Sequence, residues 1–285
     1  MSAYIYNTRD DPKRISGKGA DNTRVFETHF SDKNIPLGLN MIDVEGGANY
    51  RIASYIKGSE PVKGKDEVYD TTFDLGTWYD TTLINAGCTW LDVSKWDRQL
   101  QFGRKNAKGN SDASFSQEYD IKFDRSFEDV PKVVVWFHWL NIDGKSPACV
   151  EASAEDVTTN GFKLRYDAPW DDTFSPAYLS VIHECKVSWV AVPQDQPNVK
   201  VGTCEALRNG ETLSEYKVEV EFDQPFHRTP RVLVALRKIV MLNKHALRIE
   251  ATAENVTPKG MTVLVKNWGG CDLLRASVDY IAVLD

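Results

Sequence analysis

The chain has 285 residues, of which 42% are hydrophobic and 26% are charged, and its formal net charge at pH 7 is −7. This length suits three all-β units of about 100 residues better than one such unit. An acidic chain without clustered Lys and Arg is not expected to bind nucleic acid or anionic lipid. No apolar run approaches the roughly 18 residues of a membrane-spanning helix, so we expect a soluble protein without membrane insertion.

The N-terminal residues contain no basic stretch followed by an apolar core, so no secretory signal is visible and a cytoplasmic or non-classically secreted protein is favoured. The cysteines are odd in number and none lies in a CxxC pair, which predicts buried, reduced thiols. They are Cys88, Cys149, Cys185, Cys204 and Cys271. His183 and Cys185 could both bind a metal ion, but no further ligands converge on them in the sequence. We expect no metal and no cofactor.

The first segment of the chain, residues 1–97, is predicted to be a β-rich unit. Its landmarks follow one another as Phe30, Pro36 before an apolar strand, Arg51, Trp78 to Thr81, and Cys88 to Val93. It departs from the later segments through a shorter spacing between Phe30 and Pro36 and through a lysine-rich loop around residues 58–66. This segment is the weakest copy of the pattern.

The second segment, residues 98–197, shows the alternation of a half-buried strand at Tyr119, Ile121 and Phe123. The stretch Lys132–Leu140 is apolar at successive positions, as expected of a strand that is covered on both faces. We therefore expect this strand to pack against its own sandwich and against a neighbouring unit.

The third segment, residues 198–285, repeats the second. The spacing from Phe222 to Pro230 equals that from Phe123 to Pro131. The stretch from Ile249 to Thr257 likewise matches the one from Val150 to Thr158, and each leads to a glycine. Internal repetition of this size indicates an array of like units. The sequence thus predicts an all-β chain of three tandem six-stranded antiparallel sandwiches.

These landmarks, in their order and spacing, resemble the H-type lectin domain, the fold of the snail agglutinin and of the C-terminal domain of the slime-mould discoidins. The resemblance covers nearly the whole chain. It implies six-stranded sandwiches that associate as trimers and bind galactose or N-acetylgalactosamine near the contacts between protomers. Three copies in one chain could form a covalent counterpart of that trimer about an approximate threefold axis, and three units in a row is the open alternative.

The resemblance also implies binding residues. The family's acidic residue lies in a Gly-x-Asp-Asn-Thr-Arg segment, which this chain reproduces around Asp21. Acids eleven residues before Phe123 and Phe222 give Asp112 and Glu211 as the candidates of the other two segments. The alternative for each of these acids is a solvated loop carboxylate.

The family's arginine falls on Arg51 and on Arg248. In the second segment the same count reaches Cys149, so the resemblance implies that this site is altered or lost. The family's Trp-His loop corresponds to three pairs of residues, Trp78 with Tyr79, Trp170 with Asp171, and Trp268 with Gly269. An indole ring can cover the apolar face of a sugar, and packing of the loop is the alternative role.

The leading functional prediction is a multivalent carbohydrate-binding lectin for galactose-type glycans of glycoproteins or glycolipids, with further homo-oligomerisation left open. No phosphate-binding loop, nucleophile elbow or His-Glu-x-x-His motif is present, so catalysis is not expected. The alternative is a structural or adhesion protein whose sandwiches bind protein partners. Sugar titration distinguishes the two hypotheses.

Overall fold

The computed structural model describes residues 1–30, 34–94, 96–97, 99–109, 116–168, 180–207, 214–241 and 246–284. Over these residues the chain forms antiparallel strands and one short 3-10 turn, η1, at Thr8–Asp10. No helix in this part of the chain has the length and hydropathy of a membrane span. The prediction of an all-β fold is confirmed.

The strands are named in chain order. The first segment contains β1 (Ser2–Asn7), β2 (Gly17–Lys18), β3 (Asp21–Thr28), β4 (Leu37–Val44), β5 (Tyr50–Pro61), β6 (Tyr69–Gly76) and β7 (Thr82–Asp92). The second contains β8 (Gln101–Lys108), β9 (Ser116–Lys122), β10 (Lys132–Ile142), β11 (Ala148–Glu155), β12 (Gly161–Asp167) and β13 (Ile182–Val192). The third contains β14 (Val199–Leu207), β15 (Glu215–Glu221), β16 (Arg231–Met241), β17 (Leu247–Thr257), β18 (Gly260–Asn267) and β19 (Leu273–Val283).

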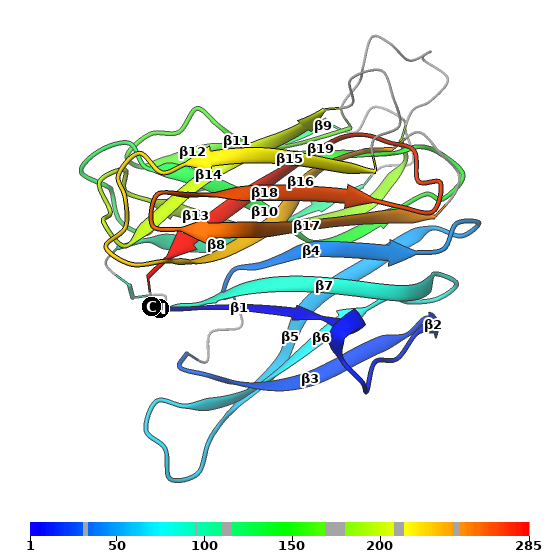
Figure 1. Ribbon diagram of the computed structural model, residues 1–285, viewed down its shortest axis with the longest axis horizontal. Helices are drawn as coiled ribbons and strands as arrows, with labels where there is room; N and C mark the ends of the chain where they lie inside the picture. Colours follow the sequence, from blue (N-terminus) through cyan, green and yellow to red (C-terminus); the bar gives the residue numbers. More distant parts are fainter. Residues whose placement is uncertain are drawn as a thin grey trace.

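These strands form three sheets, and each sheet joins two segments. Sheet A runs β1-β7-β4-β17-β18-β15, with β2 paired to β7, and it faces the viewer in Figure 1. Sheet B runs β3-β6-β5-β10-β13-β8, and sheet C runs β14-β19-β16-β11-β12-β9. The segments meet where β5 pairs with β10, β11 with β16, and β17 with β4.

The same strand order recurs in every segment. One half-sheet has the order β1-β7-β4, β8-β13-β10 or β14-β19-β16, and the other has the order β3-β6-β5, β9-β12-β11 or β15-β18-β17. Each segment therefore shares one sheet with each of the other two. This cyclic sharing is incompatible with three units in a row, while the threefold axis itself stays a prediction.

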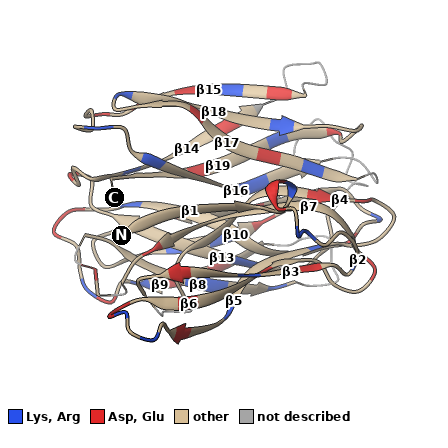
Figure 2. Cartoon of the chain, turned by 60° about the horizontal axis from the view of Figure 1, so that its bottom comes forward, with Lys and Arg blue, Asp and Glu red and all other residues tan. Residues whose placement is uncertain are grey.

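The edge strands keep the expected alternation. On β15, Val218 and Val220 pack against the core, whereas Lys217 and Glu219 point away from it. Figure 2 shows basic and acidic residues interspersed along β15. Alternation of this kind is the signature of a strand with one buried and one solvated face.

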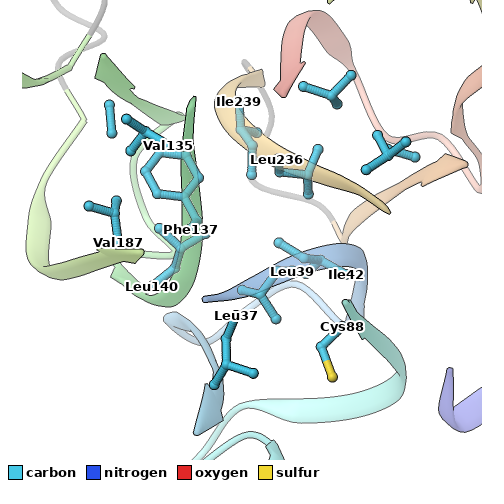
Figure 3. Close-up of a cluster of buried hydrophobic side chains, with 14 of the residues drawn as sticks. Leu37, Leu39, Ile42, Cys88, Val135, Phe137, Leu140, Val187, Leu236 and Ile239 are labelled. Atoms are coloured by element: carbon cyan, nitrogen blue, oxygen red, sulfur yellow. The ribbon is translucent and has the colours of Figure 1, made fainter. Parts of the chain in front are cut away.

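Strands β4, β10 and β16 pack together at the centre of the molecule. Figure 3 shows Leu39, Phe137 and Leu236 of these strands in a single apolar cluster, and all three side chains are fully buried. On β10, Val135 and Phe137 belong to this cluster, while the alternate residues Val134 and Trp136 belong to a second one. The prediction that this strand is covered on both faces is confirmed.

The second cluster is centred on one tryptophan. Trp136 of β10 is 1% exposed and donates its Nε1–H to the carbonyl oxygen of Asp279 over 3.2 Å. Gly38 of β4 and Ala235 of β16 stand beside it: a Cβ atom at Gly38 would lie 2.4 Å from the Ala235 Cβ and 2.9 Å from the Trp136 Cβ. One large ring and two minimal side chains thus fill the space where the three segments meet.

This packing predicts that Gly38→Ala destabilises the protein although the added group is a single methyl. The new Cβ has no room, and overpacking of a close-packed core typically costs about 1–3 kcal/mol. Gly58→Ala is the matched control, because a Cβ there meets nothing within 4 Å. Urea unfolding should show a lower midpoint for Gly38→Ala only; equal midpoints for both variants would contradict the packing argument.

Candidate functional site

A row of residues in register crosses sheet B from the first segment to the second. Each member lies opposite the next on neighbouring strands, in the order Asp21, Gly76, Ala53, Trp139 and Lys186. Opposite residues of antiparallel strands point to the same side of a sheet. We call this side the sheet B face. Gly76 and Ala53 are small, and Ala20 and Asp21 fill the space that a Cβ on Gly76 would need.

Arg51, a predicted sugar-binding residue, lies at one end of this face. It stands on β5 opposite Asn141 of β10, and its guanidinium pairs with Asp80. The guanidinium carbon also lies 5.5 Å from the ring centre of Tyr79, whose side chain is 80% exposed. The structure thus brings Arg51 and Tyr79 together. Asp80 was not among the predicted site residues, although it follows Trp78 and Tyr79 directly in the sequence.

Asp21, the predicted acid, contacts a lysine rather than Arg51. The Lys57 ammonium lies 3.6 Å from Asp21 and pairs with the buried Asp74 as well. Partial burial and the neighbouring Asp74 carboxylate raise the pKa of Asp21. Burial also opposes ionisation of Asp74, but hydrogen bonds from Lys57 and Thr23 hold its pKa below the usual value. Lys57 therefore pairs mainly with Asp74, and its contact with Asp21 is the longer of the two.

Aromatic side chains from two segments meet on the sheet B face. The rings of Trp78 and Trp139 lie 4.5 Å apart between centroids, and Tyr55 lies 6.1 Å from Trp139. The Lys186 ammonium stands 3.8 Å from the centre of the Trp139 ring. Trp78 was predicted from its loop, whereas Trp139 was missed because it lies in the second segment.

Two buried polar atoms on this face have no protein partner among the described residues. They are the indole nitrogen Nε1 of Trp139 and the side-chain oxygen of Asn141. An unpaired buried polar atom costs about 1–3 kcal/mol. Of the two residues, Asn141 is the one that lies opposite Arg51.

The junction in sheet C is closed by ion pairs. Here Cys149, opposite Val240, takes the position of Arg51, and burial raises its thiol pKa to about 11. Glu151 pairs with Lys238 over 2.9 Å and with Arg237 over 3.2 Å. The charged side chains thus neutralise one another within the protein.

The junction in sheet A resembles neither of the others. Arg248 contacts Asp43 over 3.2 Å and donates to the carbonyl oxygen of Gly269 over 3.1 Å. Gly269 has a φ of +62°, where other residues are strained, and a Cβ there would lie 2.0 Å from the Arg248 guanidinium and displace it. The neighbouring Trp268 is half-buried. Arg248 is therefore held by its own segment and by the first segment.

Four predicted residues, Asp112, Trp170, Asp171 and Glu211, lie outside the described residues. The strand register offers further candidates: Ser116 lies opposite Asp167, and Glu215 opposite Lys266, as Asp21 lies opposite Gly76. Glu215 was missed because it stands four residues beyond the position that was counted from Phe222.

The cysteines are buried, and the potential metal ligands among the described residues do not come together. All five cysteine thiols are free and buried, as predicted. His183 is exposed, whereas Cys185 is fully buried. Within the described residues, no three His, Cys, Asp or Glu side chains come together as a metal site would need.

The ion pairs of sheet C predict a pH-dependent stability. Burial raises the pKa of Asp279, which lies 3.3 Å from Arg237, to about 6. The ordinary value is about 4. The folded state therefore binds this proton more tightly, and the free energy of unfolding should fall, by up to about 1.4 kcal/mol per pH unit, as the pH rises from about 4 to about 6.

Asp279→Asn should remove this contribution. The measurement is chemical unfolding of the wild type and the variant at several pH values. Glu205→Gln, which changes a more exposed partner of the same arginine, should keep most of the wild-type slope, because burial contributes more than the Glu205 charge to the raised pKa of Asp279. A constant difference in stability between wild type and Asp279→Asn at all pH values would refute the assignment.

Comparison with known proteins gives a partial relative and two distant structures. The chain is 39% identical over 69 residues, 24% of its length, to a Fuscovulum blasticum protein described as "ATP synthase subunits region ORF 7", of which it spans 60%. Recombinant discoidin II of Dictyostelium discoideum aligns at 12% identity with a TM-score of 0.28, over 67% of this chain and 95% of that one. Wild-type discoidin II aligns at 11% identity with a TM-score of 0.26, over 67% and 93%. These scores are too low to carry an argument.

A family model gives the assignment. Residues 118–192 and 217–283 match the H-type lectin domain. The two matches lie in the second and third segments, whose strands have the same order as those of the first. The chain therefore belongs to the H-type lectin domain family and is of the carbohydrate-binding lectin kind.

Proposed function

We propose that the sheet B face binds the terminal galactose or N-acetylgalactosamine of a glycan. The observation that carries the proposal is the meeting of Arg51 and the exposed Tyr79 next to the Trp78–Trp139 pair. Sugar hydroxyls accept hydrogen bonds from a guanidinium, while the apolar face of the sugar packs against an aromatic ring. The preference for galactose-type sugars rests on the family resemblance.

The other groups of the face have matching roles. Trp78 and Trp139 cover the apolar C–H patch of the sugar, as aromatic rings do in many ligand sites. Asp21 accepts from a hydroxyl, and the exposed Tyr79 closes the outer side. A shallow site of this kind binds a free monosaccharide near 1 mM, about −4 kcal/mol.

We also propose that the three segments are three H-type lectin-like repeats with unequal sites. Arg248 and Trp268 belong to a second site on sheet A, with Glu211, the acid counted from Phe222, and Glu215, the acid opposite Lys266, as its acidic residues. The sheet C junction, to which Asp112, Trp170 and Asp171 belong, is inactive because Cys149 replaces the arginine and because its charges are already paired. Two linked sites raise avidity for a glycan-coated surface by roughly 10²–10⁴ where both engage at once.

Asp21→Ala tests the principal site. The sugar loses a charged acceptor, which typically contributes about 1.5–3 kcal/mol, so affinity at this site should fall by about one to two orders of magnitude. Lys57 keeps Asp74 as its partner, so the fold should persist. Isothermal titration with N-acetylgalactosamine measures the change.

Asp70→Ala is the matched control, because Asp70 is an exposed carboxylate on β6, the strand that pairs with β3, and lies four residues before Asp74. It should bind sugar as the wild type does. Normal binding by Asp21→Ala would show that another acid acts. Absence of binding by the wild type to any monosaccharide, with retained binding to a protein partner, would instead support the structural or adhesion function.

The unequal junctions predict the number of sites. Titration to saturation should give no more than two galactose-type sites per chain, and Arg51→Ala should remove one of them. Native mass spectrometry counts the bound sugars directly. Three equivalent sites would overturn the assignment of an inactive sheet C junction.

A further inference from the structure

Trp139, the indole that the second segment contributes to the sheet B face, has neighbours on both sides of its strand. Strand β10 lies between β5 and β13, and Trp139 stands opposite Ala53 of β5 and Lys186 of β13. The Lys186 ammonium lies over the Trp139 ring, 3.8 Å from its centre. The Trp78 ring of the first segment lies 4.5 Å from the same ring between centroids. We call Lys186, Trp139 and Trp78, in this order, the indole series.

The Lys186 ammonium is held where a cation–π contact is effective. Its side chain is 20% exposed, and the ammonium pairs over 3.1 Å with Glu184, two residues earlier on the same strand. Alternate residues of a strand share a face, so Glu184 holds the ammonium on the side of the sheet where Trp139 stands. An ammonium that has lost most of its water interacts more strongly with an indole than an exposed ammonium does.

The equivalent positions in the other two sheets hold neither an indole nor a lysine opposite it. A register irregularity interrupts the pairing of the three equivalent strands, and the residues that follow it are Trp139, Lys238 and Met41. Lys238 lies opposite Ser277, and Met41 lies opposite Gly87. The position of Lys186 is thus filled by serine or glycine where its neighbour is not an indole, so the lysine and the indole occur together.

Trp78 depends on Trp139 for support. It lies in the connection between β6 and β7, and Trp139 is the ring that it contacts among the described residues. Rotation of the Trp139 side chain would therefore release the Trp78 ring. Tyr79 follows Trp78 directly, so the exposed end of the candidate site would move with it.

We propose that Lys186 is a positioning residue of the sheet B site. Its ammonium fixes the Trp139 ring, and the Trp139 ring supports the Trp78 ring, so that the aromatic surface is ordered before a sugar arrives. Such preorganisation lowers the entropy cost of binding. Lys186 acts through Trp139 and makes no contact with the sugar. The inference rests on the proposed function, and it adds that the second segment prepares a surface that the first segment completes.

Lys186→Met removes the ammonium but keeps an unbranched side chain that can cover the ring. Affinity for N-acetylgalactosamine, at the site that Arg51→Ala removes, should fall about three- to tenfold in isothermal titration, as expected for loss of a partly desolvated cation–π contact. Lys186→Arg retains a cation that packs on an indole and should restore most of the affinity.

Lys105→Met is the matched control. The Lys105 ammonium lies 4.2 Å from the centre of the Tyr119 ring, so this variant loses the same kind of contact and the same charge in the same segment. Lys105 is adjacent to Asn106, which stands opposite Lys186, and therefore points to the other side of the sheet. It should bind sugar as the wild type does.

A double-mutant cycle tests whether Lys186 acts through the indole. In the Trp139→Leu background, Lys186→Met should cause no further loss of affinity. Near-ultraviolet circular dichroism of the free protein should show reduced indole signals in Lys186→Met and unchanged signals in Lys105→Met, since only the former loosens two tryptophan rings.

Wild-type affinity in Lys186→Met, beside normal sugar binding by the wild type, would overturn the positioning role and leave the proposed function intact. An equal loss of affinity from Lys186→Met with and without Trp139 would overturn it as well, because the lysine would then act independently of the indole. Absence of sugar binding by the wild type would overturn the proposed function and this role together.

Discussion

The structure depends on the contact between Trp136, Gly38 and Ala235, because this contact fills the space where all three segments meet. A close-packed interior tolerates neither a void nor an extra methyl group. One large side chain and two minimal ones fill this space without a void or a clash only in combination. The three segments share one strand order but carry different residues at this position. The asymmetry between the segments therefore extends into the core.

Sharing of the sheets explains where the candidate site lies. Arg51 and Trp139 stand on adjacent strands of sheet B although they belong to different segments. A ligand on this face contacts the junction, so its affinity depends on two segments at once. Each junction combines a different pair of segments. The residues of one junction can therefore change while those of the other two junctions stay the same. Sheet C shows the result, with ion pairs where sheet B has aromatic rings.

Much of the architecture could be predicted from the sequence, because its signals are local. The alternation at Val218 and Val220 fixes the inner face of a strand, and the doubly apolar stretch in β10 predicts a second covering layer. The recurrence of Phe123 and Pro131 at Phe222 and Pro230 predicts a common topology. These patterns need no knowledge of which strands become neighbours.

The site was less predictable for the same reason. Arg51 and Tyr79 meet because a strand and a loop of the same segment hold them. Trp139, Lys57 and Asp74 were missed because their roles arise from pairing across strands, which leaves no periodic trace in the sequence. Glu215, which lies opposite Lys266, was also missed, since counting from a phenylalanine does not follow strand register.

The pairing of β4 with β17 has a consequence for folding. Val44 and Leu247 are partners, so the inner edge of β4 has no mate until the ribosome has made most of the chain. Contacts so distant in sequence are slow to form, and an unpaired edge invites association with other chains in the meantime. Closure of the ring is therefore expected to be a late event of biogenesis, during which a nascent chain depends on chaperones or on dilution to avoid misassembly.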